Sequence, residues 1–487
     1  MRIFHIQRGI VLVNVLIFAT IAVTVTSALV NWGASVLKTT RMLDQREQAF
    51  QIAEAGVEYY RWHLAHAPTD YQDGTGGPGP YTHDVKDADG DVVGQYSLVI
   101  TPPLIGSTVV KVRSTGIVVG STTSRTILAT LAIPSLAKFA VVANQNMRFG
   151  AGTEVFGPVH SNSGIRFDGV SHNLITSSVT QYNDPDSDDC NNGRSFGVHT
   201  CVNPDDPRPP ATVPNRPDVF MAGRQFPVQS FDFNGLTVDL SQMKEDAQDD
   251  DVYISASGSQ GYHIVLRTDG TFDLYKVTAL QPAPNNCTNT NSQDNWGTWS
   301  VKTQVHPTTG ANNVPKNYEF PDNGVIFVED HVWVDGTIDG ARLTIAAGRF
   351  PDNVSTRKDI MINNDLIYST YDGSEVIALV AQRNISTGLF SDNNLRVDAA
   401  LVAQNGRAGR YYYESDCRSG GVNYYVRDSI TLFGMIATNN RYGFAYTDDT
   451  GYDTRNIIYD GNLLYGPPPS FPLTSSQYQT ISWQEVQ

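Results

Sequence analysis

The chain has 487 residues, which is too long for a single ordinary hydrophobic core, so two or three domains are expected. It carries 34 Lys and Arg against 50 Asp and Glu, and this net charge of -16 argues against the basic face that nucleic-acid binding requires. Aromatic residues make up 10% and there are 41 glycines, a mixture that favours β-rich structure over helical bundles.

A long apolar run follows the basic residues Arg2 and Arg8. No charged residue occurs from Gly9 to Leu37. A helix rises about 1.5 Å per residue, so a helix over this run can cross a hydrocarbon layer of about 30 Å. We therefore expect a transmembrane segment at about 10–31. The positive-inside rule places the N-terminus on the cytoplasmic side, and the rest of the chain is then exported.

The helical pattern continues beyond the expected membrane span. Apolar residues recur every seven positions on one face, and no proline occurs in residues 10–67. Pro68 and the glycine-rich stretch after it are strong helix breakers. The pattern predicts one helix over 10–66. Its N-terminal part is suited to lipid, and its C-terminal part is amphipathic and suited to packing against protein. Its packing face is predicted to contain Val36, Leu43, Phe50, Val57 and Leu64.

Two stretches of this region, RGIVLVNV and AFQIAEAGVEYY, together resemble the N-terminus of type IV pilin-like proteins, in particular the PilX-type minor pilins. In that family a prepilin peptidase cuts after the leader glycine and methylates the new N-terminal residue. The resemblance implies a leader over residues 1–9, cleavage between Gly9 and Ile10, and methylation of Ile10. It covers about the first 66 residues.

Two positions differ from the commonest pattern of that family. Major pilins usually have phenylalanine first and glutamate fifth after the cut, where this chain has Ile10 and Asn14. In pilins the glutamate meets the N-terminal amine of a neighbouring subunit, whereas Asn14 can form hydrogen bonds but has no charge. The resemblance with this departure implies a minor or tip subunit of a type IV pilus or a related pseudopilus.

The resemblance also implies partners and a location. The partners are the prepilin peptidase, other pilin or pseudopilin subunits, and membrane lipid before assembly. The precursor is expected in the inner (cytoplasmic) membrane with its head exported, and the mature form in a pilus or at the cell surface. An unprocessed, signal-anchored structural surface protein is the alternative, and a removable secretory signal is a further one.

Residues 67–135 are predicted to form a small β-rich domain. YTHDVK and VGQYSLVITP flank the polar turn DADGD, which is the pattern of a β-hairpin, and two more alternating segments follow before Pro134. We expect an antiparallel sheet that folds against the long helix, giving an α+β, pilin-like module. Asp87, Asp89 and Asp91 are expected in a solvated turn rather than in a calcium site.

Related short segments recur in residues 136–466. VFGPVHSN, VDGTIDG, VDAALVAQ and LFGMIATN share an aliphatic, small, aliphatic pattern at alternate positions. Such repeats are typical of stacked coils that bury a common column of Val, Ile and Leu. A mainly-β head is expected, a right-handed parallel β-helix or solenoid in preference to a β-sandwich. It has an insertion at about 178–322 and is followed by a Pro-rich C-terminal tail over 467–487.

The insertion contains a clear hairpin about Asp269 and Gly270. Exposed insertions on a rigid scaffold often carry recognition, so we expect an unknown surface ligand or a pilus-assembly contact there. The tyrosine clusters at 411–413 and 424–425 suit either the stacking of sugars and proteins or buried packing, and buried packing is preferred.

The four cysteines contain no C-x-x-C pair, so disulfides are expected in an exported chain, with Cys190 and Cys201 as the candidate pair. Asp184, Asp186 and Asp188 have the alternate spacing of a calcium loop. Asp189 occupies the place of the bending glycine, however, so a solvated acidic loop is preferred and no cofactor is expected.

No H-E-x-x-H, G-x-S-x-G or G-x-x-x-x-G-K-[ST] motif occurs in the sequence, so we do not expect an enzyme. The alternative in a different class is a surface-tethered β-helix carbohydrate-active enzyme, because parallel β-helices often place carboxylates for acid and base chemistry. The sequence thus predicts an anchored protein that displays a β-rich head.

Overall fold

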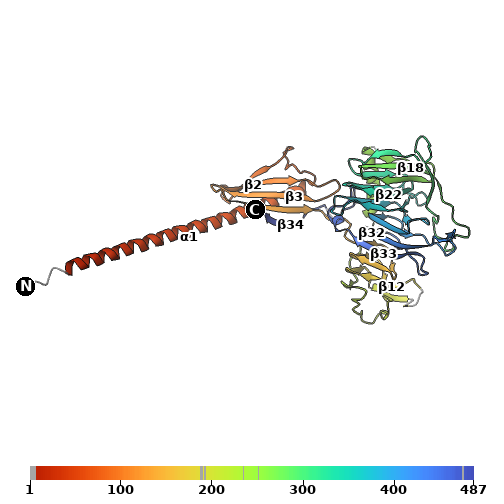
Figure 1. The fold of residues 1–487 in the computed structure, drawn as a ribbon, viewed down its shortest axis with the longest axis horizontal. Coiled ribbons are helices and arrows are strands. Elements are labelled where there is room, and N and C mark those ends of the chain that lie inside the picture. Colours follow the sequence, from red (N-terminus) through yellow and green to blue (C-terminus); the bar gives the residue numbers. More distant parts are fainter. Residues whose placement is uncertain are drawn as a thin grey trace, which may run out of the picture. The chain divides into compact units, whose positions relative to one another are not determined.

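The computed structural model describes residues 7–186, 190, 193–233, 235–250, 252–473 and 476–486. Contacts divide the chain into two compact units. The first holds the described residues within 1–102, 109–132 and 476–487, and the second those within 103–108 and 133–475. The first unit is a long helix with a small sheet, and the second is mostly β (Figure 1).

The helix α1 spans Gln7–His66 without interruption (Figure 1). It ends where Ala67 donates its N–H to the carbonyl of His63 and Pro68 follows. The sheet of this unit has the order β1-β2-β3-β4-β34 and is antiparallel throughout. Its strands are β1 (Tyr81–Lys86), β2 (Val92–Thr101), β3 (Val110–Val118), β4 (Ser124–Ala132) and β34 (Gln479–Val486). A long N-terminal helix followed by β structure is the arrangement that the sequence predicts.

The last strand of this sheet corrects the prediction of a proline-rich tail over 467–487. The prolines do lie outside strands, but the chain then forms β34, which pairs with β4 and closes one edge of the sheet. Its Trp483 contacts Phe50 of α1 edge to face, with ring centroids 5.6 Å apart. The C-terminal segment therefore belongs to the N-terminal unit.

The second unit is built on ladders of parallel strands. Successive strands align aliphatic residues in one buried column, which runs Ile345, Leu379, Leu401, Ile436 and then Val141. The ladder comprises β16 (Tyr253–Ile254), β21 (Val325–Val328), β23 (Arg342–Ala347), β26 (Val376–Ala381), β28 (Asn394–Ala403), β32 (Val426–Thr438), β5 (Val141–Ala143), β8 (Val159–Ser161), β11 (Ile175–Ser177) and β15 (Arg224–Gln225).

Further parallel ladders complete this stack, and Figure 1 shows β22, β32 and β33 as layers of it. One runs through β17 (Gly261–Leu266), β22 (Val332–Ile338), β25 (Leu366–Tyr368), β28, β32, β33 (Gly451–Tyr459), β7 (Thr153–Phe156) and β10 (Val170–Ser171). Others join β22 to β24 (Ile360–Met361), β27 (Ile385–Thr387) and β29 (Ala408–Arg410), and β6 (Met147–Phe149) to β9 (Ile165–Phe167) and β14 (Val198–His199).

The remaining elements pack on the stack or extend from it. The helix α2 (Gly235–Asp249) packs on β21, so the central strands are buried on both faces. Other additions are β12 (Gln181–Asp184) with β13 (Gly193–Phe196), β18 (Thr271–Leu280), β19 (Val301–Val305), β20 (Lys316–Glu319), β30 (Arg418–Ser419), β31 (Val422–Asn423) and the 3-10 helix η1 (Gly461–Leu464). The insertion expected at 178–322 is not wholly separate, because its strand β17 pairs in parallel with β22.

Candidate functional site

The N-terminal half of α1 presents apolar side chains to the surroundings. Within the described residues, α1 is the helix that is long and apolar enough to cross a membrane, with a window of mean hydropathy 2.3 that is 0% buried. Its threonines satisfy their own hydroxyl groups, since Thr20 and Thr24 donate to the carbonyls of Leu16 and Thr20 at 2.9 Å. Such a surface is suited to hydrocarbon, where a free hydroxyl is costly. Ile10 and Asn14 both lie on this exposed part.

The C-terminal half of α1 is covered by the sheet. Val57 and Leu64 are 2% and 0% exposed, and Phe50 packs beside this core, whereas Val36 and Leu43 are 47% and 60% exposed. The sheet thus covers three of the five residues predicted on the packing face. The other two lie before the covered segment, where a partner outside this chain is needed to bury them.

Close approach of helix and sheet depends on Gly116 and Ala49, which the sequence pattern did not identify, and on Ala53 and Tyr60, which lie beside the heptad residues on the predicted face. A Cβ on Gly116 of β3 would lie 2.2 Å from the carbonyl oxygen of Ala49 and 2.5 Å from the backbone nitrogen of Ala53. Ala49, Ala53 and Tyr60 are all 0% exposed. Small residues in AFQIAEAG were the available sequence signal, because they allow a strand to approach the helix backbone.

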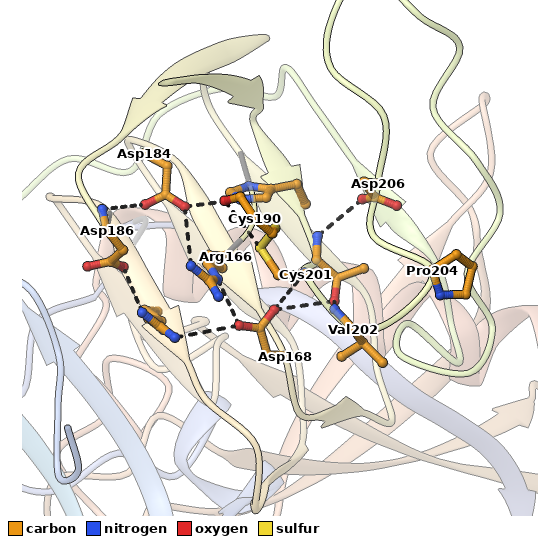
Figure 2. The surroundings of a disulfide bond; sticks show 12 residues. Arg166, Asp168, Asp184, Asp186, Cys190, Cys201, Val202, Pro204 and Asp206 are labelled. Atoms are coloured by element: carbon orange, nitrogen blue, oxygen red, sulfur yellow. Dashed lines mark hydrogen bonds and ion pairs between the residues drawn. A yellow bond between two sulfur atoms is a disulfide. The ribbon is translucent and has the colours of Figure 1, made fainter. Parts of the chain in front are cut away.

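The acidic loop of the second unit is neutralised by basic side chains, as Figure 2 shows. Nε2 of His199 lies 3.2 Å from Oδ2 of Asp184, and Arg441 donates to both oxygens of Asp186 at 3.1 and 2.5 Å. Burial acts to raise the pKa of Asp184, but the hydrogen bond with His199 helps to outweigh it and the pKa is lowered. Asp188 lies outside the described residues. Asp184 and Asp186 therefore hold this loop to the segments that carry His199 and Arg441.

No group of three or more His, Cys, Asp or Glu side chains among the described residues is arranged to hold a metal ion. The disulfide between Cys190 and Cys201 belongs to the same network (Figure 2). Oδ1 of Asp168 accepts the backbone N–H of Cys201 at 2.7 Å, and Oδ2 of Asp168 accepts Nε of Arg166 at 2.7 Å. The bond therefore fastens the loop of the β12–β13 hairpin to the segment after β14, which Asp168 in turn connects to the end of β9.

A second disulfide, between Cys287 and Cys417, joins the insertion to a loop that follows β29. It lies in a buried aromatic cluster with Leu389, Tyr411 and Tyr413, which are 0%, 3% and 1% exposed. Oη of Tyr413 donates to the carbonyl of Gly297 at 2.8 Å. Two of the three tyrosines at 411–413 thus serve buried packing.

Two buried arginines hold the loop between β27 and β28. Arg410 is 0% exposed and donates to the carbonyls of Gly388, Leu389 and Tyr424 at 2.6, 3.2 and 2.7 Å. Arg427 is 5% exposed and donates to the carbonyl of Leu389 at 2.7 Å. Burial lowers the pKa of Arg427 to about 10, and the neighbouring charge of Arg410 contributes. Together these guanidinium groups fix the backbone that carries Phe390 and Tyr424.

Replacing Arg410 by methionine is expected to lower the free energy of unfolding of the second unit by about 2 kcal/mol, because the carbonyls of Gly388, Leu389 and Tyr424 each lose a hydrogen bond from a charged donor, and that of Leu389 keeps its second one from Arg427. The matched control is Arg418→Met, since the Arg418 side chain is 65% exposed and its ion pair with Asp416 spans 4.0 Å. That change should cost less than about 0.5 kcal/mol. Hydrogen exchange of peptides from 385–425 measures both, and equal protection in the two variants would contradict the role of Arg410.

Comparisons with known proteins do not assign the chain to a family. No family model matches the sequence, and no curated protein matches it. Among solved structures, the chain is similar to the competence-associated pilin ComZ from Thermus thermophilus, with 13% identity and a TM-score of 0.30 over 91% of this chain and 98% of that chain. A likeness at this level carries no argument about function, which has to come from the residues themselves.

Proposed function

We propose that the chain is a pilin-like subunit of a type IV pilus or a related pseudopilus, held in the membrane by α1 before assembly. The observation that carries the proposal is the division of one unbroken helix into two kinds of surface. From Ile10 onward the helix exposes apolar side chains, and from Ala49 to Leu64 it is packed under a sheet. A helix of this kind can exchange lipid for the helices of other subunits while its head stays folded.

Residues at the start of the helix support a minor or tip position. The resemblance to PilX-type minor pilins places the cut between Gly9 and Ile10 and puts Asn14 where major pilins have glutamate. A subunit at the tip has no neighbouring subunit above it whose N-terminal amine must be neutralised, so it does not require a charge at this position. A subunit within the shaft would lose that ion pair.

The head is proposed to be a right-handed β-solenoid that is displayed for adhesion or for contacts with other pilus proteins. The parallel ladders and their aligned aliphatic column support this architecture, because the stacked coils of a solenoid bury a column of this kind. Two disulfides and the arginine-held loop stiffen the head, which suits a protein that carries load outside the cell.

Cleavage after Gly9 is the first test of this proposal. We expect Gly9→Val to leave the precursor uncut when it is produced in membranes together with a prepilin peptidase, because that position is the family's recognition residue. The wild-type chain should yield a mature form that begins at methylated Ile10. Intact-mass spectrometry of the purified protein measures both changes at once.

The control is Gly33→Val, since Gly33 lies on the exposed helix and a Cβ there meets no atom within 4 Å. This variant should be cut and methylated like the wild type. An intact Met1 on the wild-type protein in the presence of active peptidase would contradict the pilin-like assignment. It would favour the unprocessed, signal-anchored protein.

A further inference from the structure

A groove lies beside the hairpin of β17 and β18 in the second unit. Two cavities of about 430 and 520 Å³ meet there, and His263 and Val301 line both of them. Because they share these residues, the cavities adjoin, and together they are called here the His263 groove. The lining comes from β17 and β19 of the insertion, from β22, which pairs with β17, and from the loops after β24 and β27.

The centre of the groove is an internally neutralised pair. Nδ1 of His263 faces Oε1 of Gln304 at 2.8 Å, and Nε2 faces Oδ2 of Asp335 at 3.0 Å. Both ring nitrogens therefore face acceptors, which requires a proton on each. Burial lowers the pKa of His263, but the hydrogen bond with Asp335 outweighs it and the pKa is raised. The imidazolium and the carboxylate cancel, and Lys302 is the other charged side chain among the described lining residues.

Amide side chains supply most of the remaining polar surface. Asn364 donates Nδ2 to Asp335 at 2.6 Å. Within the described part of the chain its Oδ1, and the whole amide of Asn312 in the other cavity, make no hydrogen bond. Each of these two amides offers a donor and an acceptor side by side, so each cavity presents such a group, and Lys302 adds one positive charge to the lining.

Two aromatic side chains, Phe390 and Tyr424, belong to the lining of the first cavity and are held in place. Phe390 and Tyr424 line the groove half-buried, with their rings edge to face at 4.7 Å. The carbonyls of Leu389 and Tyr424 accept from the buried Arg410, so the backbone that carries both rings is fixed. A site that is shaped before its ligand arrives loses little conformational entropy on binding.

We propose that the His263 groove binds an uncharged oligosaccharide in extended form. Sugar hydroxyls donate and accept at the same atom, which matches paired amide groups, and the C–H faces of sugar rings pack on aromatic rings. Two adjoining cavities suit a chain of sugars better than a single compact ligand. An acidic saccharide would require more cations than Lys302. This assignment rests on the recognition role proposed for the head, and it does not depend on cleavage or assembly.

The test uses the full chain, purified in a detergent that has no sugar headgroup, on an array printed with neutral, sialylated, sulfated and uronate oligosaccharides. We expect binding to neutral glycans that survives added salt, because no ion pair with the ligand is involved. Binding confined to the acidic glycans, or no binding to any neutral glycan, would overturn the proposal. Since the assay uses unassembled protein, its failure is separate from a failure of cleavage after Gly9.

Variants then locate the binding site. Asn364→Ala and Asn312→Ala, one in each cavity, should each weaken the neutral glycan that binds best by about tenfold in titration calorimetry. The matched control is Asn183→Ala, an exposed asparagine on β12. All three residues are exposed, so unfolding midpoints should stay unchanged. Wild-type affinity in both groove variants would overturn the assignment to this groove.

Discussion

Replacing Cys287 and Cys417 together by serine is expected to lower the free energy of unfolding of the second unit by about 4 kcal/mol. The bond joins positions 130 residues apart, and constraint of the unfolded chain grows with the length of the closed loop. Both cysteines are also buried, at 6% and 0% exposure, so serine would place two hydroxyl groups in an aromatic cluster. Both effects act in the same direction.

The other disulfide provides the comparison. Cys190 and Cys201 close a separation of only 11 residues, so their replacement by serine should cost about 2 kcal/mol. Hydrogen exchange of peptides from β17 to β32, measured on the full chain in detergent, reports the stability of the unit directly. Equal losses in the two double variants would show that loop length does not determine the effect.

The long helix could be predicted because its cause is local. Absence of proline through residue 67 and an apolar residue every seven positions are sufficient to indicate it. The strand β34 was missed for the opposite reason. Its partner β4 lies far earlier in the sequence, so no local pattern connects Trp483 with Ala129. A strand at the edge of a sheet is specified by its partner as much as by its own residues.

The order of the strands in the parallel ladder also could not be predicted from the sequence. Repeats predicted that strands would stack, but β32 pairs with β5, where Ile436 lies opposite Val141. The early strands of the unit thus follow its late strands in the stack. Aliphatic residues at alternate positions fit any neighbour of the same kind, so a repeat identifies the type of layer without fixing which layers meet.

Charged residues show the same limit. The alternate spacing of Asp184 and Asp186 made them weak candidates for a metal site. In the structure they form ion pairs with Arg166 and Arg441, which lie in other segments of the chain. The groove likewise joins a predicted hairpin to an unpredicted parallel neighbour, since His263 of β17 lies opposite Trp333 of β22. Side chains that are neutralised or assembled by tertiary contacts leave no local signature.

Replacing Tyr60 by alanine is expected to lower the free energy of unfolding of the first unit by about 4 kcal/mol. The Tyr60 side chain is fully buried between α1 and the sheet, and its hydroxyl donates to the carbonyl of Asp70 at 3.1 Å. Removing it leaves a cavity and an unpaired carbonyl in one step. Tyr60→Phe separates the two contributions, and it should cost only about 1 kcal/mol because the ring remains.

Trp62→Ala is the matched control, since Trp62 is a larger aromatic residue on the same helix but is 58% exposed. Its loss should cost less than about 1 kcal/mol. Hydrogen exchange of α1 and of β2 to β4 measures all three variants, and the apolar segment near Ile10 should remain unchanged because it makes no contact with this core. If Trp62→Ala destabilised the unit as much as Tyr60→Ala, the packed face of α1 would have to be reassigned, and with it the division of the helix into a protein-packed half and an exposed half.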